Sequence, residues 1–305
     1  MRLLFAGTPA IAVPSLHALV AAGHEIVAVA TNPDAPGGRG RALTASPVAL
    51  AAEEMGVVKL QPERARDEWF GEAVQRLDLD AAVIVAWGTL IPQSLLSVPK
   101  HGWVNLHFSL LPAWRGAAPV QRAIMAGCDT TGVTTFRLVR EMDAGPVWRR
   151  DAVPIGPGET AGQLLERLAV FGAGTLVSTL GDIERGARPI EQVSEGVTLA
   201  PKVTSQDARI DWSRPARQVY NLVRGVTPAP GAWTMLGDVR LKVASVAVAE
   251  GELAPGELVV ERQRVLAGAG DGAVELLTVQ APGKPPMAGA DWARGARLGQ
   301  GARFD

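Results

Sequence analysis

The chain has a single cysteine, Cys128, among its 305 residues. One cysteine excludes an intramolecular disulfide and a zinc site built from several cysteines. The sequence also lacks any run of about 18 uncharged apolar residues, so we expect no membrane span. The first residues lack the basic region and the longer apolar core of a signal peptide. These absences favour a cytoplasmic protein that works without a metal ion and away from membranes.

Two nucleotide-binding fingerprints are also missing. The segment Gly7-Thr8-Pro9 follows a strand-like start but does not form G-x-G-x-x-G, and no G-x-x-x-x-G-K-[ST] occurs. A nicotinamide-dependent dehydrogenase is therefore a disfavoured alternative.

The charge is nearly balanced, with 30 Lys and Arg against 31 Asp and Glu, or −1. Residues 1–199 carry 17 basic against 20 acidic side chains (−3), and residues 200–305 carry 13 against 11 (+2). This weak asymmetry permits a local nucleic-acid patch in the second part but does not by itself indicate one.

Strand and helix signals alternate through the first half. Residues 25–30 and 81–86 are short apolar runs, typical of parallel strands buried on both faces. Ser46-Pro47 begins a helix that ends before Gly56, and Thr160 with Gln163 fits a capping box at another. The alternation predicts an α/β fold with a doubly wound, mostly parallel, Rossmann-like sheet. Its ligand crevice would lie at the carboxyl ends of the strands.

The pattern changes after about residue 185, where no helical or strand period is sustained. Short strand-like pieces at 239–243 and 273–277 then favour a small β-barrel or sandwich. We therefore expect an N-terminal domain at 1–188, a linker at 189–207 and a C-terminal domain at 208–305. All four histidines lie in the first half, which places any histidine chemistry there.

The richest segment runs from His101 to Pro112, where Asn105 and His107 alternate with apolar residues. Period two puts both polar side chains on one face of a strand. An amide and an imidazole side by side are suitable donors toward an oxyanion. A plain polar pair on a half-exposed strand explains the spacing equally well.

A carboxylate that could orient or charge the histidine is Asp143, on a tight turn after a strand at 132–138. Asp before Gly and Pro is also a common turn former. A pairing of Asp143 with His107 depends on both loops reaching the same crevice.

A third feature is the Gly- and Pro-rich loop at 32–41, which carries Arg39 and Arg41. It fits a basic loop that grips a phosphate backbone. A solvated surface loop is the alternative.

Taken together, segments along nearly the whole chain are similar to one known family. The matching segments are Phe5-Ala6-Gly7-Thr8-Pro9, Gly38-Arg39-Gly40, Ser46-Pro47-Val48, Ala86-Trp87-Gly88, 105–112, 114–119, Asp143-Ala144-Gly145, Ile210-Asp211-Trp212, Pro230-Gly231-Ala232-Trp233 and Gly270-Asp271-Gly272. The most specific is N-x-H-x-S-L-L-P followed by W-R-G-A-A-P. The chain thus resembles the methionyl-tRNA formyltransferase family, whose catalytic part is similar to glycinamide ribonucleotide formyltransferase.

This resemblance implies a mechanism. The α-amine of methionyl initiator tRNA would attack the formyl carbon of 10-formyltetrahydrofolate, a co-substrate that needs no metal. Asn105 and a protonated His107 would donate to the oxyanion, and Asp143 would hold His107 charged and in place. The same resemblance implies a folate pocket lined by Ser109, Leu110, Leu111, Pro112, Ala86, Trp87 and Gly88.

The resemblance also implies the partner. Arg39 and Arg41 would enter the tRNA acceptor stem, and an OB-like domain at 208–305 would hold the tRNA backbone of a cytoplasmic, monomeric enzyme of translation initiation. Two alternatives stay open: formylation of an amino sugar on a nucleotide, and a non-catalytic RNA-binding protein on a borrowed scaffold.

Overall fold

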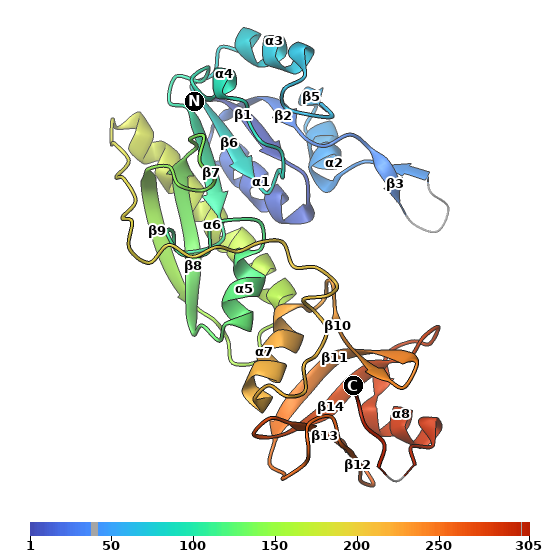
Figure 1. Cartoon of the computed structure of the whole chain (residues 1–305). Coiled ribbons are helices and arrows are strands. Elements are labelled where there is room, and N and C mark those ends of the chain that lie inside the picture. Colours follow the sequence, from blue (N-terminus) through green and yellow to red (C-terminus); the bar gives the residue numbers. More distant parts are fainter. Residues whose placement is uncertain (38–41, 300) are drawn as a thin grey trace. The chain divides into compact units, whose positions relative to one another are not determined.

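The computed structural model describes residues 1–37, 42–299 and 301–305. The chain packs into two compact units, and neither is one continuous segment. The first unit consists of Met1–Ala117, Thr131–Val153 and Leu165–Ala200. The second consists of Ala118–Thr130, Pro154–Leu164 and Pro201–Asp305. Each unit has its own sheet (Figure 1).

The elements of the described chain follow one another in this order: β1 (Arg2–Gly7), η1 (Ala10–Ala12), α1 (Val13–Ala21), β2 (Glu25–Ala30), β3 (Ala35–Gly37), β4 (Ala42–Thr44), α2 (Pro47–Glu54), β5 (Lys59–Leu60), α3 (Glu68–Arg76), β6 (Ala81–Val85), α4 (Gln93–Leu96), β7 (Trp103–His107), α5 (Pro119–Met125), β8 (Thr130–Arg137), β9 (Val147–Pro154), α6 (Ala161–Glu184), α7 (Ala216–Gly225), β10 (Ala232–Leu236), β11 (Val239–Ala249), β12 (Leu258–Val260), β13 (Val265–Ala269), β14 (Gly272–Gln280), β15 (Met287–Ala288) and α8 (Gly289–Ala296).

The first unit is built on a sheet in the order β5-β2-β1-β6-β7-β8-β9. Strands β5, β2, β1, β6 and β7 are parallel, and β8 pairs with β7 in the antiparallel direction. All five residues of β6 are buried, as expected for a strand covered on both faces. The prediction of a mostly parallel α/β sheet is confirmed. The strand order reverses beside β1, which places a crevice at the carboxyl ends of β1 and β6.

Local signals set the helix ends. Ser46 is the N-cap of α2 and its side chain accepts the amide proton of Ala49, while Gly56 follows the helix with a φ of +66°. Thr160 and Gln163 form the expected reciprocal capping box ahead of α6.

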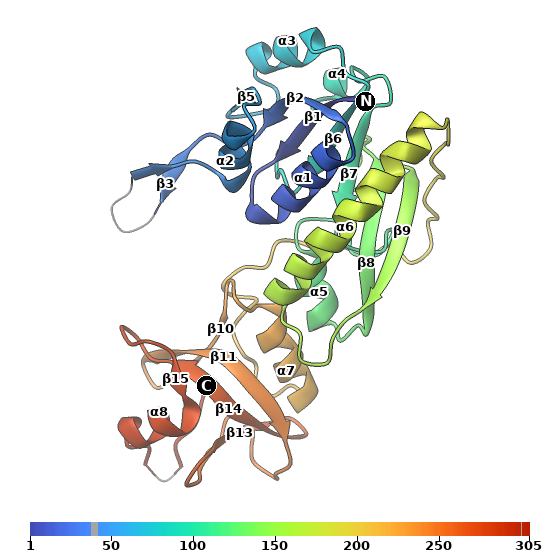
Figure 2. The same ribbon diagram turned by 180° about the vertical axis from the view of Figure 1, so that it is seen from behind.

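Helix α6 lies across the sheet (Figure 2). A Cβ added at Gly172 would lie 3.0 Å from Leu106 and 3.2 Å from Val133, so the helix packs closely on β7 and β8. By length and composition, this helix could cross a membrane. We expected no such helix from the sequence, because Glu166 and Arg167 interrupt its run of apolar residues. Half of its most apolar window is buried inside the protein, and a core helix of a soluble protein meets the same criterion.

The second unit contains an antiparallel sheet in the order β10-β11-β14-β13-β12, with β15 paired to β14. The strand predicted at 239–243 is the start of β11, and the strand predicted at 273–277 lies within the first part of β14. The unit's own core includes Trp212, Val243 and Trp292. The prediction of a C-terminal β unit is therefore confirmed at the level of an antiparallel sheet.

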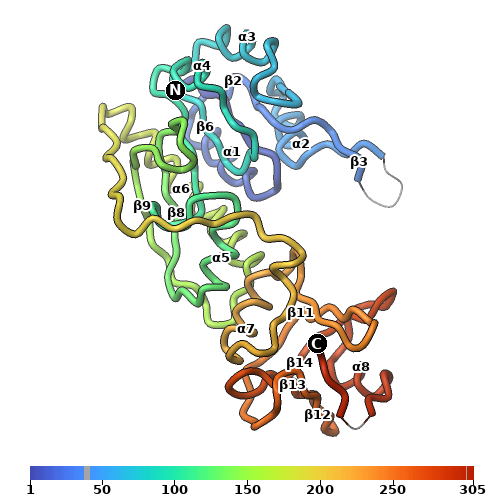
Figure 3. The backbone as a smooth tube through the Cα atoms, in the orientation of Figure 1, coloured from blue at the N-terminus to red at the C-terminus, as the bar shows by residue number. Residues whose placement is uncertain are grey.

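Residues 190–200, which we call the crossing segment, have no helix or regular strand but are fixed to the first unit. Ile190 exchanges two backbone hydrogen bonds with Val147 at the start of β9. Further along, the Arg115 amide donates to Thr198 and the Ala200 amide donates to Arg115. Figure 3 traces this segment beside β9 and on past β8. Much of the stretch expected to be a linker is thus part of the first unit's packing.

Candidate active site

Strand β7 presents Asn105 and His107 on the sheet face opposite α6. Leu106, between them, points toward Gly172 of α6, whereas Trp103 belongs to the core cluster on the other face. Alternation then puts Asn105 and His107 on the Trp103 face. Asn105 is half-buried, and no described residue hydrogen-bonds to its side-chain amide. The amide is therefore free to donate to a substrate.

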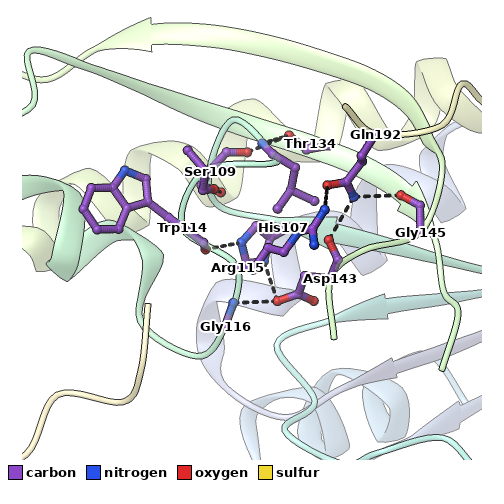
Figure 4. Close-up of polar contacts among 11 residues, drawn as sticks. His107, Ser109, Trp114, Arg115, Gly116, Thr134, Asp143, Gly145 and Gln192 are labelled. Atoms are coloured by element: carbon purple, nitrogen blue, oxygen red, sulfur yellow. Dashed lines mark hydrogen bonds and ion pairs between the residues drawn. The ribbon is translucent and has the colours of Figure 1, made fainter. Parts of the chain in front are cut away.

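The His107 ring is 7% exposed and lies between two oxygen atoms (Figure 4). Its Nε2 is 2.9 Å from the carbonyl oxygen of Trp114. A carbonyl can only accept, so Nε2 carries the proton of this hydrogen bond. Its Nδ1 is 3.8 Å from Oδ2 of Asp143, a distance that suits an ion pair and is too long for a hydrogen bond. The structure thus brings together the histidine and the carboxylate that the sequence could not pair.

Asp143 reaches this position from a turn after β8. Its φ is +50°, in the left-handed region that Asp adopts more readily than most residues. Its Oδ2 accepts a hydrogen bond of 2.7 Å from the backbone amide of Gly116. The side chain is only 14% exposed. The carboxylate is therefore held on one side by Gly116 and faces the imidazole on the other.

The charge expected on His107 is not favoured in this structure. Burial lowers the pKa of His107 below its ordinary value of 6.5, and this is the largest effect. Asp143 and the Trp114 carbonyl raise the pKa of the ring, as expected, but by less than burial lowers it. Desolvation therefore opposes the protonated form that Asp143 favours, and a protonated His107 during formyl transfer stays a prediction.

The segment Ser109–Pro112 follows β7 and forms a turn that several hydrogen bonds hold in place. The Ser109 hydroxyl donates to the Ala113 carbonyl (2.6 Å) and the side chain is fully buried. The Thr134 hydroxyl donates to the Ser109 carbonyl (2.6 Å) and accepts from the Leu111 amide (3.1 Å). Leu111 is buried, while Leu110 and Pro112 are half-buried. The turn can therefore offer backbone groups and two partly exposed apolar side chains to a ligand.

The segment Ala86-Trp87-Gly88 follows β6. Ala86 has a φ of +50° and Gly88 a φ of +21°, so the backbone turns sharply here. The Trp87 indole is buried in the core, 5.8 Å from the Phe70 ring, and its Nε1 has no partner among the described residues. Trp87 thus serves packing, and its neighbours present backbone.

One residue of the site, Gln192, has no signal in the sequence. Gln192, in the crossing segment, donates to the carbonyls of Asp143 and Gly145 and accepts from the Arg115 guanidinium. Arg115 stands in the W-R-G segment already singled out, but Gln192 lies in a stretch without any period. Only the fold places it beside Asp143.

Arg39 and Arg41 lie outside the described residues, between β3 and β4, which pair with each other. No group of three or more His, Cys, Asp or Glu suited to a metal ion occurs within the described parts of the chain. A cleft of about 950 Å³ at the opposite end of β7, beside Gly102 and Arg137, includes none of the three predicted catalytic residues.

Comparison with known proteins identifies this arrangement. The sequence profile described as "Formyl transferase" matches residues 1–180, and "Formyl transferase, C-terminal domain" matches residues 202–297. The chain belongs to the formyl transferase family. It is accordingly an enzyme that transfers a formyl group, which argues against a non-catalytic scaffold and a dehydrogenase.

Relatives cover the full length. Methionyl-tRNA formyltransferase from a Nocardioides species is 55% identical, covering 100% of this chain and 98% of the relative. The enzyme of the same name from Streptomyces coelicolor is 54% identical, covering 99% of each chain. These full-length matches confirm the resemblance found in the sequence.

A solved structure shares the fold. The N-formyltransferase from Helicobacter canadensis, in complex with folinic acid and dTDP-3-aminofucose, superposes with a TM-score of 0.69 at 15% identity. The match covers 92% of this chain and 99% of that one. At this identity the likeness concerns the fold alone.

Proposed function

We propose that this enzyme transfers the formyl group of 10-formyltetrahydrofolate to the α-amino group of methionyl initiator tRNA, giving N-formylmethionyl-tRNA for translation initiation. The full-length identity to methionyl-tRNA formyltransferases carries the choice of acceptor. The pairing of His107 with Asp143 beside Asn105 supplies chemistry that fits it.

In this reaction the amine nitrogen forms a bond to the formyl carbon, and the bond from that carbon to N10 of the folate breaks. The Asn105 amide donates to the formyl oxygen as negative charge develops there. Because Nε2 of His107 already carries a proton, Nδ1 is the nitrogen that can take the proton of the attacking amine. Asp143 then stabilises the charged ring, and the same proton passes to N10 as it leaves. No bond to the protein is needed.

The folate would bind at two segments. The backbone of Ser109, Leu110, Leu111 and Pro112 supports one side, because Thr134 holds it rigid at the end of β7. Ala86, Trp87 and Gly88 would form the other side through backbone groups, because the Trp87 indole is committed to the core.

The tRNA would be held by two regions. Arg39 and Arg41 supply positive charge in the first. In the second unit, Arg209 and Arg240 are exposed and their guanidinium carbons lie 5.6 Å and 4.0 Å from the centre of the Trp233 ring. Neither arginine forms an ion pair with a described carboxylate, so both charges are available to phosphates.

We propose a catalytic domain at 1–188 and an OB-like tRNA-binding domain at 208–305, connected by 189–207, of which the crossing segment packs on the first unit. The antiparallel order of β10 to β14 supports the proposed OB-like domain. Asn105, His107 and Asp143 all come from the first unit of one chain, which suits a monomer. With a tRNA substrate, we place the enzyme in the cytoplasm and away from membranes.

The deciding experiment measures transfer of a radiolabelled formyl group from 10-formyltetrahydrofolate to methionyl initiator tRNA. Methionyl elongator tRNA is the control acceptor, and a nucleotide-linked amino sugar tests the alternative. We expect efficient transfer to the initiator tRNA alone. Preferred transfer to the sugar would refute the proposed acceptor.

A His107→Asn variant assigns the chemistry in the same assay. It should lose nearly all transfer while tRNA affinity, measured by filter binding, persists. An Arg39→Ala variant should instead weaken use of the tRNA, and unchanged acceptor kinetics would remove that loop from the proposed interface.

A further inference from the structure

The side-chain amide of Gln192 makes three hydrogen bonds that converge on the turn carrying Asp143. Its Nε2 donates to the carbonyl oxygens of Asp143 (2.8 Å) and Gly145 (2.7 Å). Its Oε1 accepts from Arg115 at 2.7 Å. Figure 4 shows the amide between Arg115 and the Asp143 turn. Both amide hydrogens and the oxygen are thus engaged.

Besides Gln192, the turn is held by a backbone hydrogen bond from Ala144 to Glu141 (3.4 Å) and, at its end, by one from Arg137 to Pro146 (2.9 Å). Asp143 adopts a left-handed conformation, with a φ of +50°, which residues with a side chain adopt less readily than glycine. Its neighbour Met142 is 59% exposed. A backbone of this kind keeps its conformation only when contacts around it fix it.

The crossing segment also fixes the carboxylate end of Asp143, through Gly116. The Gly116 amide donates to Asp143 Oδ2, and the residue before it, Arg115, is bonded to Thr198 and Ala200. A Cβ at Gly116 would lie 2.7 Å from the Ala200 carbonyl oxygen, and its φ is +125°. Glycine is therefore needed for this close approach. One segment thus places both the backbone and the carboxylate of Asp143.

We propose that Gln192 is a positioning residue for formyl transfer, which holds the Asp143 turn so that the carboxylate faces Nδ1 of His107. This proposal rests on the proposed roles of His107 and Asp143. Gln192 touches neither reacting atom. It acts on the rate through the distance between the Asp143 carboxylate and the His107 ring.

The first test uses three full-length variants. Gln192→Leu removes all three hydrogen bonds at similar size. Gln192→Glu keeps an acceptor for Arg115 but loses both donors and places a carboxylate against two carbonyls. Glu191→Gln is the matched control, because this exposed neighbour makes no hydrogen bond with any described residue. Thermal unfolding of each variant confirms that it is folded at the assay temperature.

We expect Gln192→Leu and Gln192→Glu to lower kcat about ten- to a hundredfold, with KM for tRNA and folate within about twofold of wild type. Glu191→Gln should match wild type. Wild-type kcat in folded Gln192→Leu, or a raised KM with unchanged kcat, would overturn the proposal.

A double-mutant cycle separates positioning from general weakening of the structure. In an Asp143→Asn background, Gln192→Leu should cost little further rate, because the group that it positions is already gone. Two full, multiplying losses would show that Gln192 acts independently of Asp143 and would refute the inference.

A titration without substrate separates this inference from the proposed function. Nuclear magnetic resonance of the labelled His107 ring should show a lower pKa in Gln192→Leu than in wild type, since the carboxylate that raises it moves away. An unchanged His107 titration would overturn the positioning role whatever the acceptor is. Absence of formyl transfer by wild type would instead refute the proposed function.

Discussion

Two opposing effects act on the imidazole of His107. Burial disfavours its charged form, and the carboxylate of Asp143 at 3.8 Å favours it. Burial thus favours the neutral ring, and Asp143 places a negative group beside the ring when it takes up a proton. Such a ring suits a reaction in which a proton is first removed from an amine and then returned to a leaving nitrogen.

The donor at Asn105 gives the first prediction at this scale. Asn105→Ala should lower kcat about 10²–10³-fold, because one donor to the developing oxyanion is lost. Asn105→Asp keeps the shape but replaces the donor by a negative charge, so its loss should be at least as large. Steady-state formylation of methionyl initiator tRNA measures both. Near-normal kcat in Asn105→Ala would remove this residue from the mechanism.

The second prediction concerns stability and pH. Because the pKa of His107 is lower in the folded chain than its ordinary value of 6.5, the unfolded chain binds more protons between these two values. Stability therefore rises with pH across that window and is lost as pH falls below about 6.5. His24, whose pKa burial also lowers, adds to the same slope.

Measurement of Tm between about pH 5 and 7.5 tests this linkage. The His107→Asn variant should show a shallower rise of Tm with pH than wild type, and His24 should leave a residual slope. A His107→Asn variant with the full wild-type slope would mean that His107 is not buried neutral.

At the scale of elements, strand β8 fixes the loop that leaves β7. Thr134 on β8 satisfies the buried Ser109 carbonyl and Leu111 amide with a single hydroxyl. Thr131, on the same strand and also buried, has a hydroxyl without a partner among the described residues. These two threonines form a matched pair for mutation.

Thr134→Val should lower the free energy of unfolding by about 1–3 kcal/mol, because two buried backbone groups lose their partner. Thr131→Val should be neutral or slightly stabilising, because it removes an unpaired buried hydroxyl. Urea unfolding of both variants measures the difference. Equal losses in the two would contradict the assigned role of the Thr134 hydroxyl.

The elements that the sequence predicts well carry their signal locally. Strand β2 has the predicted bounds, and the Ser46 cap and the Thr160 capping box form as expected because donor and acceptor lie three residues apart. The crossing segment has no such signal. Its hydrogen bonds go to residues that are distant in the sequence. Neither its path nor the role of Gln192 can therefore be predicted from a periodic pattern or from residue spacing.

The same limit applies to the site. Alternation along one strand is local, so Asn105 and His107 could be placed on one face from the sequence. Their relation to Asp143 depends on a turn that follows the next strand, β8, and on the amide of Gly116. The charge of His107 depends on how deeply the fold buries it, and this depth has no sequence pattern.

At the scale of the whole molecule, the chain must bind a polyanion with a net charge of −1. Overall attraction cannot supply the affinity, so local groups of basic side chains must do so. Arg209 and Arg240 combine exposure, an aromatic neighbour in Trp233 and no described acidic partner, and Arg217 has the same combination beside Tyr220. Binding through phosphates releases counterions and makes the affinity depend on salt.

The last prediction follows from that dependence. Replacing Arg209 and Arg240 together by Gln should reduce the slope of log KM for tRNA against log salt by about 1.5, at roughly 0.7–0.9 per lost phosphate contact, with kcat unchanged at saturating tRNA. Arg264→Gln is the control, because its charge lies in the same unit but is already paired with Glu261. A slope in the double variant equal to that of wild type would mean that these arginines do not contact the tRNA backbone. Other basic side chains, such as Arg39 and Arg41, would then bind it.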